Sequence, residues 1–86
     1  MSLETTLKQI KVICNEINRN ATNNELVIRI NTDADTFEQD YEFCLSFDEE
    51  ADAECVESTK NINVLNEVLR NMLNIGFVVS FETNYF

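Results

Sequence analysis

The first twenty residues carry apolar side chains at helical spacing. Steps of three and four residues place these side chains on one stripe of a helix. The stripe consists of Leu3, Leu7, Ile10, Cys14 and Ile17, and Ile13 widens it. Ser2 suits the N-cap position, because its hydroxyl accepts from a free amide of the first turn. The pattern therefore predicts a helix over residues 3–19, which the polar run 20–24 ends.

Two later segments alternate apolar and polar residues with a period of two. In ELVIRINT, residues 25–32, Leu26, Ile28 and Ile30 share one face. In DYEFCLSFD, residues 40–48, the shared face is aromatic and aliphatic, and it consists of Tyr41, Phe43, Leu45 and Phe47. This alternation predicts two strands. A polar connection of about eight residues joins them, which is long for a hairpin.

A second helical stripe lies between Thr59 and Ile75. It consists of Ile62, Leu65, Val68, Leu69, Met72 and Leu73. The start of this helix is open over residues 49–58, with Asp48 and Ser58 as candidate caps. Gly76 suits the position after the helix, because a left-handed backbone costs glycine nothing, and Phe77 would add a hydrophobic contact. The segment FVVSF, residues 77–81, predicts a third strand before the tail ETNYF.

The element order α-β-β-α-β predicts an α+β fold in two layers, built as a single domain over residues 1–86. The expected sheet has three strands in the order 2-1-3 with antiparallel neighbours, and both helices cover one face. The covered face would carry Ile28, Phe43 and Phe81. The open face would carry Val27, Arg29, Glu42, Cys44, Ser46 and Ser80.

The charge of −10 is concentrated in one segment. Eleven of the sixteen acids lie within residues 33–57, which contain no lysine or arginine. They form two clusters on either side of the second strand, so a ribbon of negative charge along one sheet edge is expected. Solubility alone is the alternative explanation. The candidate partner-binding residues are Asp33, Asp35, Glu38, Asp40, Glu42, Glu49, Glu50, Asp52 and Glu54.

The segment NTDADTFEQDYE, residues 31–42, partly matches the twelve-residue calcium loop of an EF-hand. Asp33, Asp35 and Glu42 occupy the third, fifth and twelfth positions of such a loop. Thr36 stands where glycine makes the sharp turn, and Glu38 stands where an apolar residue belongs. The flanking patterns also predict strands instead of helices. We therefore expect neither a specific metal site nor any cofactor.

The composition argues against an enzyme. No histidine is present, which removes the commonest general base and its pairings with serine or cysteine. The three cysteines show no CxxC spacing, so reduced thiols are expected. Cys14 fits a small buried hydrophobe, and Cys44 would lie on the open face. Cys55, flanked by Glu54 and Glu57, is expected to be a poor nucleophile because nearby anions disfavour its thiolate.

The size and charge suggest three functional hypotheses. The chain is similar in composition to small acidic inhibitors of phages and mobile elements, among them DNA-mimicking anti-restriction and anti-CRISPR proteins and uracil-DNA glycosylase inhibitors. That similarity implies a non-enzymatic inhibitor that occupies the basic nucleic-acid-binding groove of an enzyme or defence complex. The second hypothesis is an antitoxin or immunity protein that neutralises a basic toxin. The third is a structural or assembly subunit that acts through the open sheet face or the C-terminal aromatics Tyr85 and Phe86.

The expected partner is a basic protein, and direct nucleic-acid binding is disfavoured because the six bases are scattered. Homodimerisation stays open. Tyr85 and Phe86 either extend the last strand and fold back on the core, or form an exposed anchor for a dimer or target. No apolar run approaches the roughly 20 residues that span a bilayer. A cytoplasmic protein is expected, in the host cell if a phage encodes it.

Overall fold

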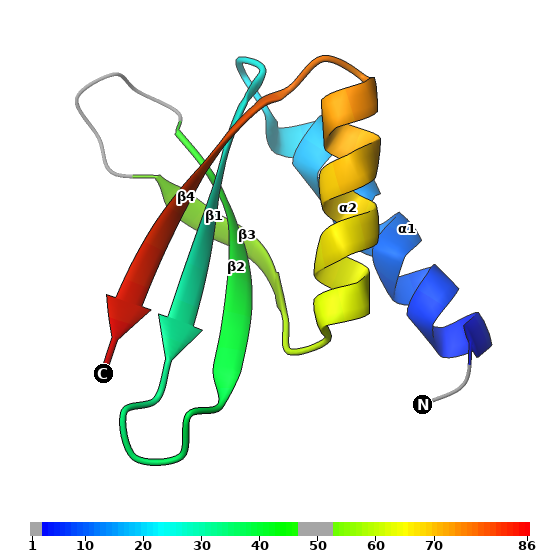
Figure 1. Cartoon of the computed structure of the whole chain (residues 1–86). Coiled ribbons are helices and arrows are strands. Elements are labelled where there is room, and N and C mark those ends of the chain that lie inside the picture. The colour runs from blue at the N-terminus through cyan, green and yellow to red at the C-terminus, as the bar shows by residue number, and fades with distance from the viewer. Residues whose placement is uncertain (1–2, 47–52) are drawn as a thin grey trace.

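Two helices cover one face of a four-stranded sheet in the computed structural model (Figure 1). The structure describes residues 3–46 and 53–86, with side chains from residue 5 onward. Ser2, Phe47 and Asp48 lie outside the described residues. The elements are α1 (Leu3–Asn20), β1 (Glu25–Thr32), β2 (Gln39–Leu45), β3 (Glu54–Thr59), α2 (Ile62–Asn74) and β4 (Val78–Tyr85). The α+β class is confirmed.

The sheet has one strand more than the sequence pattern indicated. Its order is β3-β2-β1-β4, in which β1 and β3 are antiparallel to β2, while β4 is parallel to β1. The expected position of the last strand beside β1 is confirmed, but its expected antiparallel direction is wrong. The crossover through α2 leaves from β3 instead of β2, and this reverses the direction of β4.

The missing strand, β3, was hidden by its polar composition. Its sequence ECVEST lies at a sheet edge, and Thr59 is its only fully buried residue. A bulge opposite Phe43 and Cys44 also breaks the regular alternation of the strand. The helix begins later than expected, at Ile62, where the Asn61 side chain accepts from the Asn63 amide at 2.9 Å. Ser58 therefore belongs to β3 and is not a cap.

The buried stripes of both helices differ in part from the expected ones. Among the α1 side chains that the structure describes, Ile10, Ile13 and Ile17 are buried, whereas Leu7 is exposed and Cys14 is half-buried. The Leu3 side chain of the expected stripe lies outside the described part. The buried face of α2 consists of Val64, Leu65, Val68 and Met72. Steps of four from Val64 through Val68 to Met72 centre that face, so the expected core positions Ile62 and Leu73 fall outside it and are exposed.

Ile28 of β1 has a phenylalanine beside it on each neighbouring strand, and the two differ in burial. Phe43 of β2 and Phe81 of β4 are both its register partners, so all three share the helix-covered side. Phe43 is 0% exposed, whereas Phe81 is 55% exposed. Phe81 therefore lies on the expected side of the sheet, but the expectation that the helices cover it is wrong, because β4 is an edge strand that runs away from both helices (Figure 1).

Gly76 ends α2 as expected from the sequence. Its φ is +99°, a left-handed conformation that favours glycine. The Gly76 amide donates to the Leu73 carbonyl at 3.2 Å, and the Phe77 amide donates to the Met72 carbonyl at 3.0 Å. Phe77 is buried. These bonds form a Schellman motif with its hydrophobic contact, which turns the chain sharply into β4.

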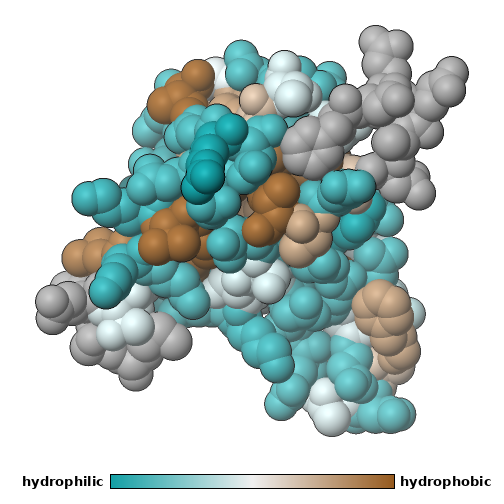
Figure 2. All heavy atoms as spheres, turned by 180° about the vertical axis from the view of Figure 1, so that it is seen from behind, coloured by the Kyte–Doolittle hydropathy of each residue, from teal (hydrophilic) through white to brown (hydrophobic). Residues whose placement is uncertain are grey.

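The surface seen from behind is mostly hydrophilic, and its hydrophobic side chains lie in separate areas (Figure 2). Scattered apolar side chains of this kind are normal on a folded domain and need no partner. Within the described part of the chain, neither helix has the length and hydropathy to cross a membrane.

Candidate protein-binding surface

The acidic connection between β1 and β2 is a tight turn that its own side chains hold together. The Asp33 amide donates to the Glu38 carbonyl at 2.9 Å, and the Phe37 amide donates to the Asp33 carbonyl at 2.8 Å. Asp33 Oδ1 accepts from the amides of Asp35 and Thr36, at 2.8 and 3.2 Å. Thr36 Oγ1 accepts from the Glu38 amide at 3.3 Å. The carboxylates of this turn are therefore carried on a well-fixed backbone.

Phe37 at the tip of this turn has an unfavourable backbone and an exposed ring. Its φ is +60°, in the left-handed region that costs a non-glycine residue roughly 1–2 kcal/mol. Its side chain is 77% exposed, so the ring gains little from burial in this fold. Backbone strain of this kind is concentrated at functional sites in proteins. Phe37 thus joins the acids of the turn as a candidate contact residue.

The end of β4 holds the turn in place. The Phe86 amide donates to the Thr32 carbonyl at 3.0 Å, and the Ala34 amide donates to the Phe86 carbonyl at 2.8 Å. Tyr85 and Phe86 are each 76% exposed. Tyr85 extends the last strand, as one of the two interpretations expected, and Phe86 follows the strand. The expected return of both residues to the core is wrong. We call the surface formed by Asp33, Asp35, Phe37, Glu38, Tyr85 and Phe86 the hairpin end.

The acids of the hairpin end lack ion-pair partners among residues 3–46 and 53–86. The ion pairs formed there are Glu16–Arg19, Glu82–Arg29 and Glu67–Arg70, and all of their acids lie outside segment 33–57. Lys60 lines a hollow of about 200 Å³ together with Asp33, Glu38 and Asp40. Three exposed carboxylates and three exposed aromatic rings therefore share one end of the sheet.

The structure brings together only some of the predicted binding residues. Asp33, Asp35 and Glu38 lie on the turn, and Asp40 lies beside them at the start of β2. Glu42 lies farther along β2 on the open face, and Glu54 lies at the other end of β2, paired with Leu45. Glu49, Glu50 and Asp52 lie outside the described residues. We expected a ribbon of negative charge along a sheet edge formed by β2. That expectation is wrong, because β2 is an interior strand between β1 and β3.

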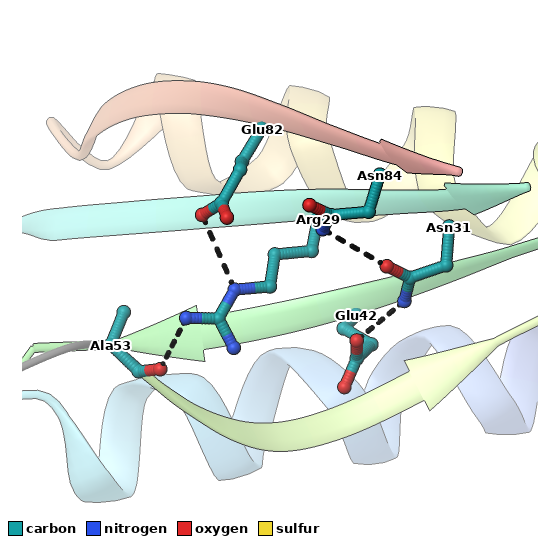
Figure 3. Close-up of polar contacts among 6 residues, drawn as sticks. All are labelled: Arg29, Asn31, Glu42, Ala53, Glu82 and Asn84. Atoms are coloured by element: carbon teal, nitrogen blue, oxygen red, sulfur yellow. Dashed lines mark hydrogen bonds and ion pairs between the residues drawn. The ribbon is translucent and has the colours of Figure 1, made fainter. Parts of the chain in front are cut away.

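The open face carries a polar network that the sequence pattern did not reveal (Figure 3). Arg29 of β1 donates to Glu82 of β4 at 3.3 Å and to the Ala53 carbonyl at 2.8 Å. The Asn31 amide group donates to the Glu42 carboxylate. The side-chain amide of Asn84 donates in turn to Oδ1 of Asn31 at 3.2 Å. One signal could have located the network, since Arg29 is the single base in the segments expected to form strands.

Cys44 and Cys55 are register partners on β2 and β3, and both are free thiols. Cys44 lies on the open face as expected, yet it is fully buried, and burial raises the pKa of its thiol. Desolvation, followed by the nearby Glu42 carboxylate, raises the pKa of Cys55 to about 12. A weak thiolate at Cys55 was expected, but the acid that disfavours it is Glu42 and not Glu54 or Glu57. The thiol of Cys14 also has a raised pKa because of burial.

Three of the acceptor side chains that suggested a calcium loop are used in bonds within the protein. Asp33 caps the turn, while Asn31 and Glu42 bond to each other on the open face. Strands flank the segment on both sides, as expected. Within the described ranges, no three histidine, cysteine, aspartate or glutamate side chains are grouped to hold a metal ion.

Comparison of the chain with protein-family models, with curated proteins and with solved structures finds no match in any of the three. The function must therefore be inferred from the surface itself.

Proposed function

We propose that this chain is a non-enzymatic inhibitor whose hairpin end binds the basic nucleic-acid-binding groove of a target protein. The target would be a nucleic-acid enzyme or a defence complex, of the kind that phages and mobile elements counteract. Asp33, Asp35 and Glu38 would occupy positions that phosphates occupy in the bound nucleic acid. The exposed rings of the hairpin end would fill apolar recesses in the groove.

One observation carries this proposal. The exposed carboxylates of the turn have no ion-pair partner in the described part of the chain, although the chain forms such pairs elsewhere. Asp35 and Glu38 are moreover presented on a turn that hydrogen bonds fix in one shape. Prearranged charges lose little conformational entropy on binding, which favours affinity for a complementary basic surface.

The aromatic rings give this surface a second means of contact. Aromatic residues are enriched among the side chains that dominate protein interfaces. An arginine of the target could lie over a ring and pair with a neighbouring carboxylate at the same time. Binding would therefore combine a salt-sensitive part from the acids with a salt-insensitive part from the rings.

Neutralising the turn tests the contribution of its acids. The triple variant Asp33→Asn, Asp35→Asn, Glu38→Gln is expected to lose at least tenfold in affinity, because each charge faces a basic partner. The matched control Glu16→Gln, Glu25→Gln, Glu67→Gln makes the same change in net charge away from the turn and should keep most of the affinity. The measurement is capture of proteins from a bacterial lysate at about 50 mM and about 500 mM salt, with mass spectrometry of the bound fraction.

Displacement decides whether the captured protein is bound through its groove. A basic nucleic-acid-binding protein that is released by added double-stranded DNA, and that the triple variant fails to hold, supports the proposal. Equal capture by the triple variant and wild type contradicts it. Capture of a single toxin that nucleic acid does not displace would instead favour the antitoxin hypothesis.

Phe37→Gly separates binding from folding. Glycine adopts a φ of +60° without strain, so the variant is expected to gain about 1 kcal/mol of stability in thermal unfolding. It also removes the exposed ring, so capture of the same partner should weaken several-fold. Phe37→Asn, which tolerates this φ and keeps a side chain, serves as the companion variant. A stabilised Phe37→Gly protein that binds as well as wild type would show that the ring takes no part in binding.

A further inference from the structure

Strand β4 is an edge strand whose outer backbone groups face away from the sheet. The Val78 amide donates inward to the Asn24 carbonyl at 2.7 Å, and Phe86 bonds to the carbonyl of Thr32 and the amide of Ala34. Backbone groups point alternately to the two sides of a strand. Val79, Phe81, Thr83 and Tyr85 therefore direct their N–H and C=O groups toward the free edge.

Among the described residues, this edge lacks three of the common devices that protect sheet edges from pairing. Proteins commonly place lysine, proline or a bulge on such an edge. Residues 77–86 contain neither lysine nor proline, and β4 pairs with β1 in an unbroken register from Val78 to Tyr85. Two apolar side chains of β4 are instead exposed: Val78 is 69% exposed and Phe81 is 55% exposed.

Charge is also distributed unequally between the two edges of the sheet. Glu82 is the only charged residue of segment 77–86, and it is ion-paired with Arg29 at 3.3 Å. The opposite edge strand, β3, carries Glu54 and Glu57, which make no ion pair among the described residues. In a chain of charge −10, β4 is thus the edge where a second equally acidic copy meets the least repulsion.

We propose that β4 pairs antiparallel with β4 of a second copy, about a two-fold axis at Phe81, and joins the two sheets into one. This register places Phe81 opposite its own copy and Val79 opposite Thr83 of the second copy, all with outward-facing backbone groups. Glu82 lies opposite Ser80 of the second copy, so no two carboxylates face each other. A centre at Glu82 would oppose two like charges, which is destabilising.

The second copy is favoured over an unrelated peptide by this self-complementarity. One strand satisfies its own free groups, places the apolar Phe81 ring against its own copy and avoids its own single charge. The dimer goes beyond the proposed function, because it uses the edge of β4 and leaves the acids of the turn free. The two associations should respond oppositely to salt: screening relieves repulsion between two acidic copies, but it weakens binding to a basic partner.

Sedimentation equilibrium of the purified chain tests the dimer. The expected result is a concentration-dependent rise from 9.9 kDa toward twice that mass, with tighter association at about 500 mM than at about 50 mM salt. Thr83→Pro should abolish the dimer and keep the fold by circular dichroism, since the Thr83 amide faces the free edge, where proline is tolerated. Thr83→Val keeps the amide and should dimerise like wild type.

A second pair of variants guards against a folding defect in the proline variant. Phe81→Lys places a charge at the two-fold axis and should weaken association at least tenfold. Val12→Lys makes the same kind of change at an exposed position of α1 and should have no effect. A monomer at every concentration and salt level would overturn the proposal, and so would dimers that both Thr83→Pro and Phe81→Lys leave intact.

Discussion

Phe43→Ala is expected to lower the free energy of unfolding by roughly 3–5 kcal/mol, whereas Phe81→Ala should cost less than about 1 kcal/mol. The two residues are a natural matched pair, because both are register partners of Ile28 on the same side of the sheet. Phe43 is 0% exposed in the core, so its truncation leaves a cavity. Phe81 is 55% exposed and loses little buried surface on truncation.

Urea unfolding followed by circular dichroism would measure both values. A small domain has only about 5–15 kcal/mol of stability, so Phe43→Ala should be strongly destabilised or unfolded at room temperature. The measurement is made at a protein concentration where wild type is monomeric, because association through β4 would make Phe81 appear more important. Equal losses for the two variants would mean that the helices cover β4 as well as β2.

Arg29→Met is expected to cost about 2 kcal/mol, the second largest effect. Methionine keeps the apolar stem but removes the donors to the Ala53 carbonyl and to Glu82. It also removes the base that lies in register between Glu42 and Glu82. The exposed ion pair with Glu82 contributes little of the total. Most of the loss comes from the charge-assisted bond to the Ala53 carbonyl and from the uncompensated carboxylates.

The control for this prediction is Arg70→Met. Arg70 is 70% exposed in its side chain and pairs with Glu67 one helical turn away, an arrangement worth a few tenths of a kcal/mol. The Arg29 side chain is only 24% exposed. The stability difference between Arg29→Met and wild type should shrink when Glu82→Gln is added, since one of the repelling acids is then gone. Equal effects of the two methionine substitutions would show that the open-face network adds no stability.

The elements with strong local patterns were predictable from the sequence. β1 was located at its observed bounds, and α1 was located within one residue. Gly76 marked the end of α2 because only glycine adopts its φ without strain. β3 was not predictable in the same way. Its burial depends on the neighbouring β2 and α1, and its acids gave it no apolar alternation to detect.

The candidate surface was only partly predictable for a related reason. The acids of the turn were evident from their density in the sequence. It was not evident that these acids lie beside Tyr85 and Phe86, because this proximity depends on the parallel pairing of β4 with β1. Local patterns also cannot show that Asp33 uses one carboxylate oxygen to cap the turn. Such relations arise only from the tertiary arrangement.

The parallel pairing of β1 with β4 also constrains the order in which this chain can fold. The β1–β2 hairpin starts from the neighbours Thr32 and Gln39, which lie seven positions apart, so it closes a short loop. Ile28 and Phe81 lie 53 positions apart, and their pairing closes a much longer loop at a higher entropic cost. During synthesis, β1 therefore stays an open edge until the ribosome has released the last strand. A chain interrupted before residue 78 would retain the hairpin and expose β1 to pairing with other chains.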